Sequence, residues 1–237
     1  MAKQAFVIPR SELVASGLIP ASAEGKATYT RLTKDMLAKL FELAATPGIG
    51  TFRERGGPHD VEKDPTVQQI IVYGFVVRPD GRFMVYQRSA TEAYDEERLR
   101  GRVSLGLGGH MEPSDLSLEH AFYRELDEET VITAAGQTLN FRRQDGTTDI
   151  EHMQQYVRIE PVGLIKDERD DVGAHHLGIA CRLSPVQKDM EIAVRPENGE
   201  NVHSSFITAD EYRQQVQSGD IVPEGWTDIV FREEIAQ

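Results

Sequence analysis

The chain is short of cysteine and of long apolar runs, and each shortage excludes a class of protein. Its 237 residues include a single cysteine, Cys181, which excludes an internal disulfide. The apolar setting of that residue, LGIACRL, predicts a buried thiol in a strand. No run is long enough to span a membrane, and the N-terminal MAKQAFVIPR lacks the apolar core of a signal peptide. We therefore expect a cytoplasmic protein without a membrane partner.

Basic residues are also scarce relative to acidic ones. Lys and Arg number 26 against 39 Asp and Glu, for a net charge of -13. Such a surface repels polyanions, so we expect no extended nucleic acid as a partner. A small phosphorylated substrate can still bind through a metal ion and a few arginines.

The length fits one domain with additions. AFVI at 5–8 predicts a short strand ended by Pro9, and spaced leucines predict an amphipathic helix over 30–45, ended by Pro47 and Gly48. A glycine-rich, charged connection follows. We place the boundary there, with residues 1–64 as an N-terminal extension and residues 65–237 as the main domain.

The main domain opens with two strand-like runs, QQIIVYGFVV and RFMVYQR, joined by the turn sequence RPDG. They predict a β-hairpin. QQYVRIEPVGLIKDE and HHLGIACRL predict two further strands. Near the C-terminus, TADE is a capping-box sequence that opens a helix ended by Gly219, and TDIVFREEI predicts a last helix.

The most informative stretch runs over 103–132, VSLGLGGHMEPSDLSLEHAFYRELDEETVI. Its second half has the spacing of an amphipathic helix, with Glu125, Glu128 and Glu129 together on one face. Like charges at these separations destabilise a helix by about 0.2–0.5 kcal/mol per pair, and a bound cation would reverse that sign. Mg²⁺ prefers such oxygen ligands and takes further ones from substrate phosphates. The alternative is a solvated face in which Arg124 pairs with Glu128.

A glycine-rich turn precedes this helix. Gly106, Gly108 and Gly109 let the backbone turn sharply and approach a ligand closely. Ser117 is the expected N-cap of the helix. Turn, cap, apolar face and acidic face together favour a metal-phosphate site over a merely solvated helix.

The stretch resembles the box of the Nudix (MutT-type) hydrolases, Gly-x5-Glu-x7-Arg-Glu-apolar-x-Glu-Glu-x-Gly-apolar. The matching positions are Gly109, Arg124, Glu125, Leu126, Glu128, Glu129 and Ile132. There are three departures: Asp115 stands for the first Glu, one extra residue is placed at Leu116, and Val131 replaces the last Gly. FRERGGPHDVEKDPTVQQIIVYGFVV, SLGLGGHMEPSD and DDVGAHHLGIA further resemble predicted MutT-family phosphoesterases of bacteria and phages.

The resemblance covers roughly residues 67–210 and implies an α/β fold, a Nudix-like α/β/α sandwich with a mixed sheet. It implies Mg²⁺, or Mn²⁺ in its place, held by Glu125, Glu128 and Glu129, to which the Gly109 carbonyl can add a ligand. The implied reaction is cleavage of a phosphoanhydride in a nucleoside diphosphate linked to another moiety. One of these glutamates or an outside acid would be the general base, and Arg124 would orient Glu128. Relatives are frequently homodimers, so a homodimer is an expectation by analogy.

Candidates outside the box are less specific. Asp167 or Glu168 is the expected extra acid, although a solvated turn explains both equally well. Arg88 and His176 are candidate substrate contacts, as are His175 and the loop arginines Arg98, Arg100 and Arg102. For the histidines a structural role is favoured over a catalytic one.

Two other functions remain open. One is a Nudix-fold regulatory module that binds a nucleotide-like ligand without turnover, for which the altered glycine position is the only hint. The other is the isomerase branch, acting on isopentenyl diphosphate with a catalytic cysteine, which the apolar setting of Cys181 disfavours.

Overall fold

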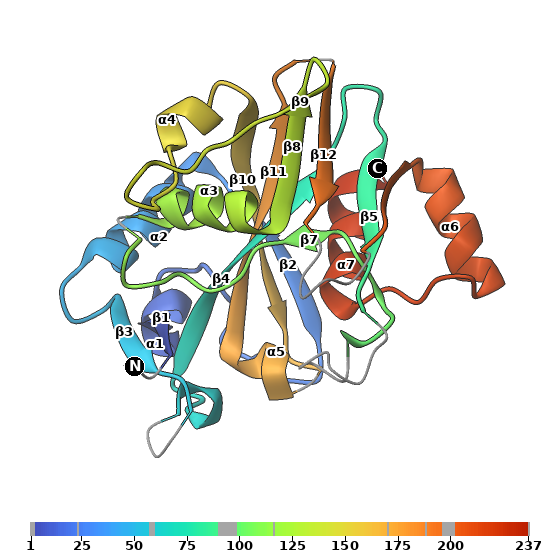
Figure 1. Cartoon of the computed structure of the whole chain (residues 1–237). Coiled ribbons are helices and arrows are strands. Elements are labelled where there is room, and N and C mark those ends of the chain that lie inside the picture. The colour runs from blue at the N-terminus through green and yellow to red at the C-terminus, as the bar shows by residue number, and fades with distance from the viewer. Residues whose placement is uncertain are drawn as a thin grey trace. The chain divides into compact units, whose positions relative to one another are not determined.

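The computed structural model describes residues 3–22, 24–56, 60–89, 99–115, 117–169, 171–187, 189–195 and 202–236. The chain forms two compact units. Unit 1 comprises Met1–Tyr73, Gly108–Phe122 and Pro161–Cys181, and unit 2 comprises Gly74–Leu107, Tyr123–Glu160 and Arg182–Gln237. Figure 1 shows both units, with elements labelled where there is room.

Four elements contribute residues to both units, namely β4 (Val67–Val76), α3 (Leu118–Glu129), β10 (Val157–Asp167) and β11 (His176–Pro185). The other elements of unit 1 are β1 (Gln4–Pro9), α1 (Arg10–Ala15), β2 (Ala27–Arg31), α2 (Lys34–Ala45), β3 (Thr51–Glu54), η1 (Val61–Lys63) and α5 (Asp171–His175). Its strands follow the order β2-β10-β11-β4-β1-β3.

The first 64 residues supply three strands of this sheet. β1 pairs antiparallel with β3 and β4, and β2 pairs antiparallel with β10. The predicted strand at 5–8 is confirmed as β1. The predicted helix is confirmed as α2, which begins at Lys34 because the Thr33 side chain caps it by accepting from the Met36 N–H at 3.2 Å. The boundary at residue 64 stays a prediction.

Unit 2 contains β5 (Phe83–Gln87), β6 (Val103–Ser104), β7 (Gly106–Leu107), β8 (Thr130–Ala134), β9 (Gln137–Thr138), α4 (Ile150–Met153), β12 (Met190–Val194), β13 (Ser204–Ile207), α6 (Ala209–Ser218), α7 (Gly225–Val230) and η3 (Phe231–Ile235). β12, β8 and β9 form one sheet, side by side in Figure 1, and β13, β5 and β6 form another. One apolar cluster includes Leu126 of α3, Ile132 of β8 and Ile192 of β12. The acidic helix is therefore anchored in unit 2 through its apolar face.

The predicted hairpin is only partly correct. The turn forms, with the Arg78 N–H donating to the Arg82 carbonyl at 2.8 Å. The strands then separate after a single bridge between Val77 and Phe83, because β5 pairs with β13 and β6 instead. The turn sequence determines that the chain reverses direction, but the strands that compete for pairing determine which backbone hydrogen bonds form.

The predicted caps of two helices are confirmed. The Ser117 hydroxyl caps α3 by accepting from the His120 N–H at 3.1 Å. After Glu129 the β-branched residues continue as β8. Thr208 and Glu211 form the capping box of α6, and Gly219 ends that helix in the left-handed conformation.

The predicted mixed α/β fold and the burial of Cys181, which is 0% exposed, are confirmed. Within the described part of the chain, none of the helices is long and apolar enough to cross a membrane.

Candidate functional site

The acidic helix α3 brings two of the predicted metal ligands onto one guanidinium group. Arg124 Nη1 donates to Glu128 Oε2 at 3.0 Å and lies 3.0 Å from Glu125 Oε1. The Arg124 side chain is 8% exposed and that of Glu125 12%, whereas Glu128 is 41% exposed. Because one buried arginine bridges both carboxylates, their directions on the helix are fixed.

A second arginine, which the sequence did not indicate, joins this group from a distant loop. Arg142 Nη2 lies 3.3 Å from Glu128 Oε1, and Arg142 Nε pairs with Asp127 Oδ2 at 2.5 Å. Asp127 is buried and also accepts from the Thr148 hydroxyl at 3.2 Å. Arg142 and Glu128 are 14 positions apart, and no motif has that spacing, so the sequence alone does not predict their contact.

The end of α3 is held by Arg195, the residue that follows β12. The Arg195 guanidinium donates to the Thr130 carbonyl at 2.7 Å and to the Asp127 carbonyl at 3.2 Å. The Arg195 N–H donates to the Glu129 carbonyl at 2.6 Å. A cation at the last carbonyls stabilises a helix terminus, and here it takes the place of the C-terminal glycine that the family pattern leads one to expect.

Gly108, Gly109 and Asp115 lie in unit 1. The Gly109 carbonyl accepts from the Val72 N–H at 2.9 Å. Asp115 accepts from the Glu112 N–H at 2.7 Å and lies 2.9 Å from His120 Nδ1, with its side chain 0% exposed. Asp115 therefore has a structural role in the loop, whereas Gly109 as a metal ligand stays a prediction.

Within the described residues, three metal-ligating side chains lie together outside the acidic helix, namely Glu62, His110 and His176. Their ligand atoms all lie within 4.8 Å of one another. Burial, with smaller contributions from Arg55 and His176, lowers the pKa of His110 to about 3, so its imidazole is neutral at pH 7. The sequence suggested His176 alone, because the other two residues lie 114 and 66 positions earlier.

The remaining candidates are engaged with other groups of the protein. Arg88 Nε donates to the buried Glu224 at 2.9 Å. Asp167 pairs with Arg169 at 2.7 Å, and Glu168 accepts from Arg10 at 2.6 Å. Although burial opposes it, the hydrogen bond from Arg10 and the charge of Lys166 lower the pKa of Glu168.

Two other named candidates, His175 and Arg102, have backbone partners, and one, Arg98, lies outside the described residues. His175 Nδ1 lies 3.3 Å from the Asp64 carbonyl oxygen. Arg102 donates to the Pro223 carbonyl at 3.2 Å. Arg98 lies outside the described residues. Substrate contact by Arg88 or His176 stays a prediction.

Comparison with known proteins identifies the class to which this fold and acidic helix belong. The NUDIX domain family model matches residues 67–174, a range that includes the whole acidic helix. The chain belongs to the Nudix superfamily of hydrolases.

Two known proteins are similar to the chain over much of its length. It is 30% identical over 161 residues to Protein YmaB of Bacillus subtilis (strain 168), a match that spans 65% of this chain and 66% of the relative. The crystal structure of Tm1382, a candidate Nudix hydrolase, has a TM-score of 0.61 at 21% identity and covers 96% of this chain and 95% of its own. This second likeness shows the fold.

Proposed function

We propose that the protein is a metal-dependent hydrolase that cleaves a phosphoanhydride in a nucleoside diphosphate linked to another moiety. The observation that carries the proposal is the arrangement on α3, where Arg124 holds Glu125 and Glu128 at 3.0 Å each in a chain of the Nudix superfamily. Glu129 belongs to the same acidic run of the helix.

The residues of α3 suit a hard divalent cation. Glu125, Glu128 and Glu129 offer carboxylate oxygens, the ligands that Mg²⁺ and Mn²⁺ prefer. Three carboxylates, those of Glu125, Asp127 and Glu128, pair with the two arginines Arg124 and Arg142, so negative charge is in excess. With 41% of its side chain exposed, Glu128 is open to a hydrated ion.

Each residue then has a distinct task. Glu125, Glu128 and Glu129 would hold Mg²⁺ or Mn²⁺. The ion would neutralise the negative charge that develops on the phosphate oxygens when water attacks. Arg124 keeps the Glu125 and Glu128 side chains in one orientation, so that little rearrangement is needed on binding. A carboxylate of this set, or one outside it, accepts the proton of the attacking water as general base.

A panel of nucleoside di- and triphosphates, nucleotide sugars and dinucleotides tests this proposal. With Mg²⁺ or Mn²⁺ present, the wild type should hydrolyse at least one class, and Glu129→Gln should lower kcat by about 100-fold or more. Glu119→Gln is the matched control, because Glu119 lies exposed in the first turn of the same helix, and it should retain wild-type activity.

Two results would overturn the proposal. One is full activity in Glu129→Gln. The other is binding of a panel member by the wild type without turnover, which would make the protein a nucleotide-binding module.

A further inference from the structure

Three side chains from separate segments of unit 1 converge outside the acidic helix. Glu62 lies in η1, His110 follows the glycine turn, and His176 is the first residue of β11. His176 Nε2 lies 3.9 Å from Glu62 Oε2, and the two imidazole rings are 5.5 Å apart between centroids at an interplanar angle of 73°.

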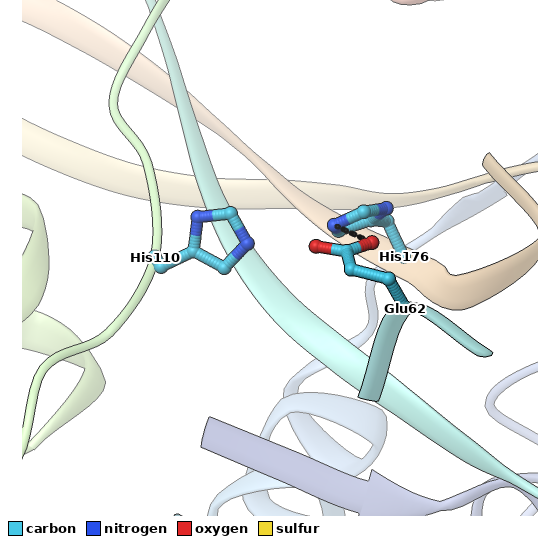
Figure 2. A group of neighbouring side chains, drawn as sticks. All are labelled: Glu62, His110 and His176. Carbon is cyan, nitrogen blue, oxygen red and sulfur yellow. Dashed lines mark ion pairs between the residues drawn. The ribbon is translucent and has the colours of Figure 1, made fainter. Parts of the chain in front are cut away.

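The ring orientations in Figure 2 place ligand atoms toward a common point. One nitrogen of His110 points toward the Glu62 carboxylate and the His176 ring. His110 Nδ1 is the nitrogen that lies 3.4 Å from Arg55 Nη1, so the nitrogen directed at Glu62 and His176 is Nε2. Two imidazole nitrogens and one carboxylate oxygen thus face each other within 4.8 Å.

The backbone at the two histidines is held in place independently of any ligand. His110 forms a bridge with Ile71, next to the hydrogen bond between the Val72 N–H and the Gly109 carbonyl. The start of β11 is fixed by the buried Lys166, whose Nζ donates to the Gly173 carbonyl at 2.8 Å and lies 3.4 Å from the His176 carbonyl.

Glu62 is oriented from both ends. Its N–H donates to the Asp60 carboxylate at 3.1 Å, and its Oε1 accepts from Arg55 Nε at 3.1 Å. The second carboxylate oxygen, Oε2, is the one that faces His176. A ligating carboxylate in a metal site usually has such an outer partner on its other oxygen.

We propose that Glu62, His110 and His176 bind one borderline divalent transition-metal ion, Zn²⁺ above all, with a coordination position left for water or an exogenous donor. Two imidazoles and one carboxylate are the ligand set of catalytic zinc sites, in which water occupies the fourth position. Imidazole nitrogen selects Zn²⁺, Ni²⁺ or Cu²⁺ over Mg²⁺, whereas α3 offers oxygen only. The chain therefore has two metal sites of different preference.

Arg55 sets the main cost of binding. Coordination through His110 Nε2 places the ring proton on Nδ1, so the contact between Nδ1 and Arg55 has to be released. At 3.4 Å this contact is at the long limit of a hydrogen bond, and its loss costs little. The guanidinium keeps its bonds to Glu62 Oε1 at 3.0 and 3.1 Å, so the carboxylate stays oriented.

Calorimetric titration of the metal-free full chain with Zn²⁺, in excess Mg²⁺, tests the site. The wild type should take up one Zn²⁺ per chain. His110→Ala and His176→Ala should each weaken the affinity by more than the roughly 10–100-fold that loss of an outer partner causes. Glu62→Gln should weaken it as well, and this variant keeps the fold because its amide oxygen can still accept from Arg55.

Two matched controls separate this site from the alternatives. His203→Ala removes an exposed histidine and should leave the affinity for Zn²⁺ unchanged. Glu129→Gln should also leave it unchanged, since that residue lies on α3. Absence of stoichiometric uptake, wild-type affinity in His176→Ala and Glu62→Gln, or loss of uptake in Glu129→Gln would each overturn the proposal.

Discussion

At the scale of single residues, Lys166 is a charged side chain that is almost fully buried. It is 2% exposed, burial lowers its pKa to about 8, and its Nζ donates to the Gly173 and Ala174 carbonyls at 2.8 and 2.6 Å. Lys166→Met would leave the Gly173 carbonyl without this donor, at about 1–3 kcal/mol for a buried acceptor, whereas the Ala174 carbonyl keeps a hydrogen bond from the Gln68 side-chain amide at 3.1 Å. We expect the free energy of unfolding at pH 7, measured with urea, to fall by about 1–3 kcal/mol.

The exposed Lys26 supplies the control for that measurement. Lys26→Met should change the free energy of unfolding by less than about 0.5 kcal/mol, as is usual for surface substitutions. Equal stability of the two variants would show that the Lys166 hydrogen bonds contribute nothing.

At the same scale, local spacing limited what the sequence could predict. The pair between Arg124 and Glu128 follows from helical periodicity, and the structure has it at 3.0 Å. The contact between Arg88 and Glu224 joins positions 136 residues apart, and no periodicity links them. The grouping of Glu62 and His110 with His176 was beyond sequence reasoning for the same reason, because three segments must fold before their side chains meet.

Among the elements, the turn before α3 depends on one glycine. Gly108 has a φ of +125°, and a Cβ there would run into the Val72 carbonyl oxygen, a backbone atom that cannot swing away. Gly108→Ala should therefore lower the free energy of unfolding by about 3 kcal/mol or more, from backbone strain of about 1–3 kcal/mol plus the clash. Chemical denaturation of the full chain measures this loss.

Gly25→Ala is the control that separates the cost of backbone strain from the cost of the clash with Val72. Gly25 has a φ of +67°, with nothing within 4 Å of an added Cβ, so its substitution should cost only about 1–2 kcal/mol. If Gly108→Ala and Gly25→Ala lowered the free energy of unfolding equally, the close approach of Gly108 to Val72 would contribute nothing to the cost of the substitution.

Elements with their own boundary signals could be predicted from the sequence, and those defined by distant partners could not. α2, β10, β11 and α6 have clear apolar patterns, caps or breakers, and the structure has all four. β3 lies within the charged connection, where it forms only because β1 offers an antiparallel edge. The separation of β4 from β5 has the same origin, since β13 and β6 pair with β5.

For the molecule as a whole, the two proposed metal sites belong to different units. Glu62, His110 and His176 all lie in unit 1, whereas Glu125, Glu128 and Glu129 all lie in unit 2. A ligand stabilises the state that binds it, by about 2.7 kcal/mol at a concentration of 100 times Kd. Zn²⁺ and Mg²⁺ should accordingly each stabilise the folded chain, and each through its own site.

Differential scanning calorimetry with each metal alone tests this division. At about 100 times Kd, each metal should raise the Tm of the protein by about 5–10 °C, the shift expected for about 2.7 kcal/mol in a chain of this size. His176→Ala should lose the response to Zn²⁺ and keep that to Mg²⁺, and Glu129→Gln should do the reverse. The proposal of two separate sites would be contradicted if His176→Ala kept the Tm shift with Zn²⁺, or if Glu129→Gln lost it. A single site on α3 would then account for both metals.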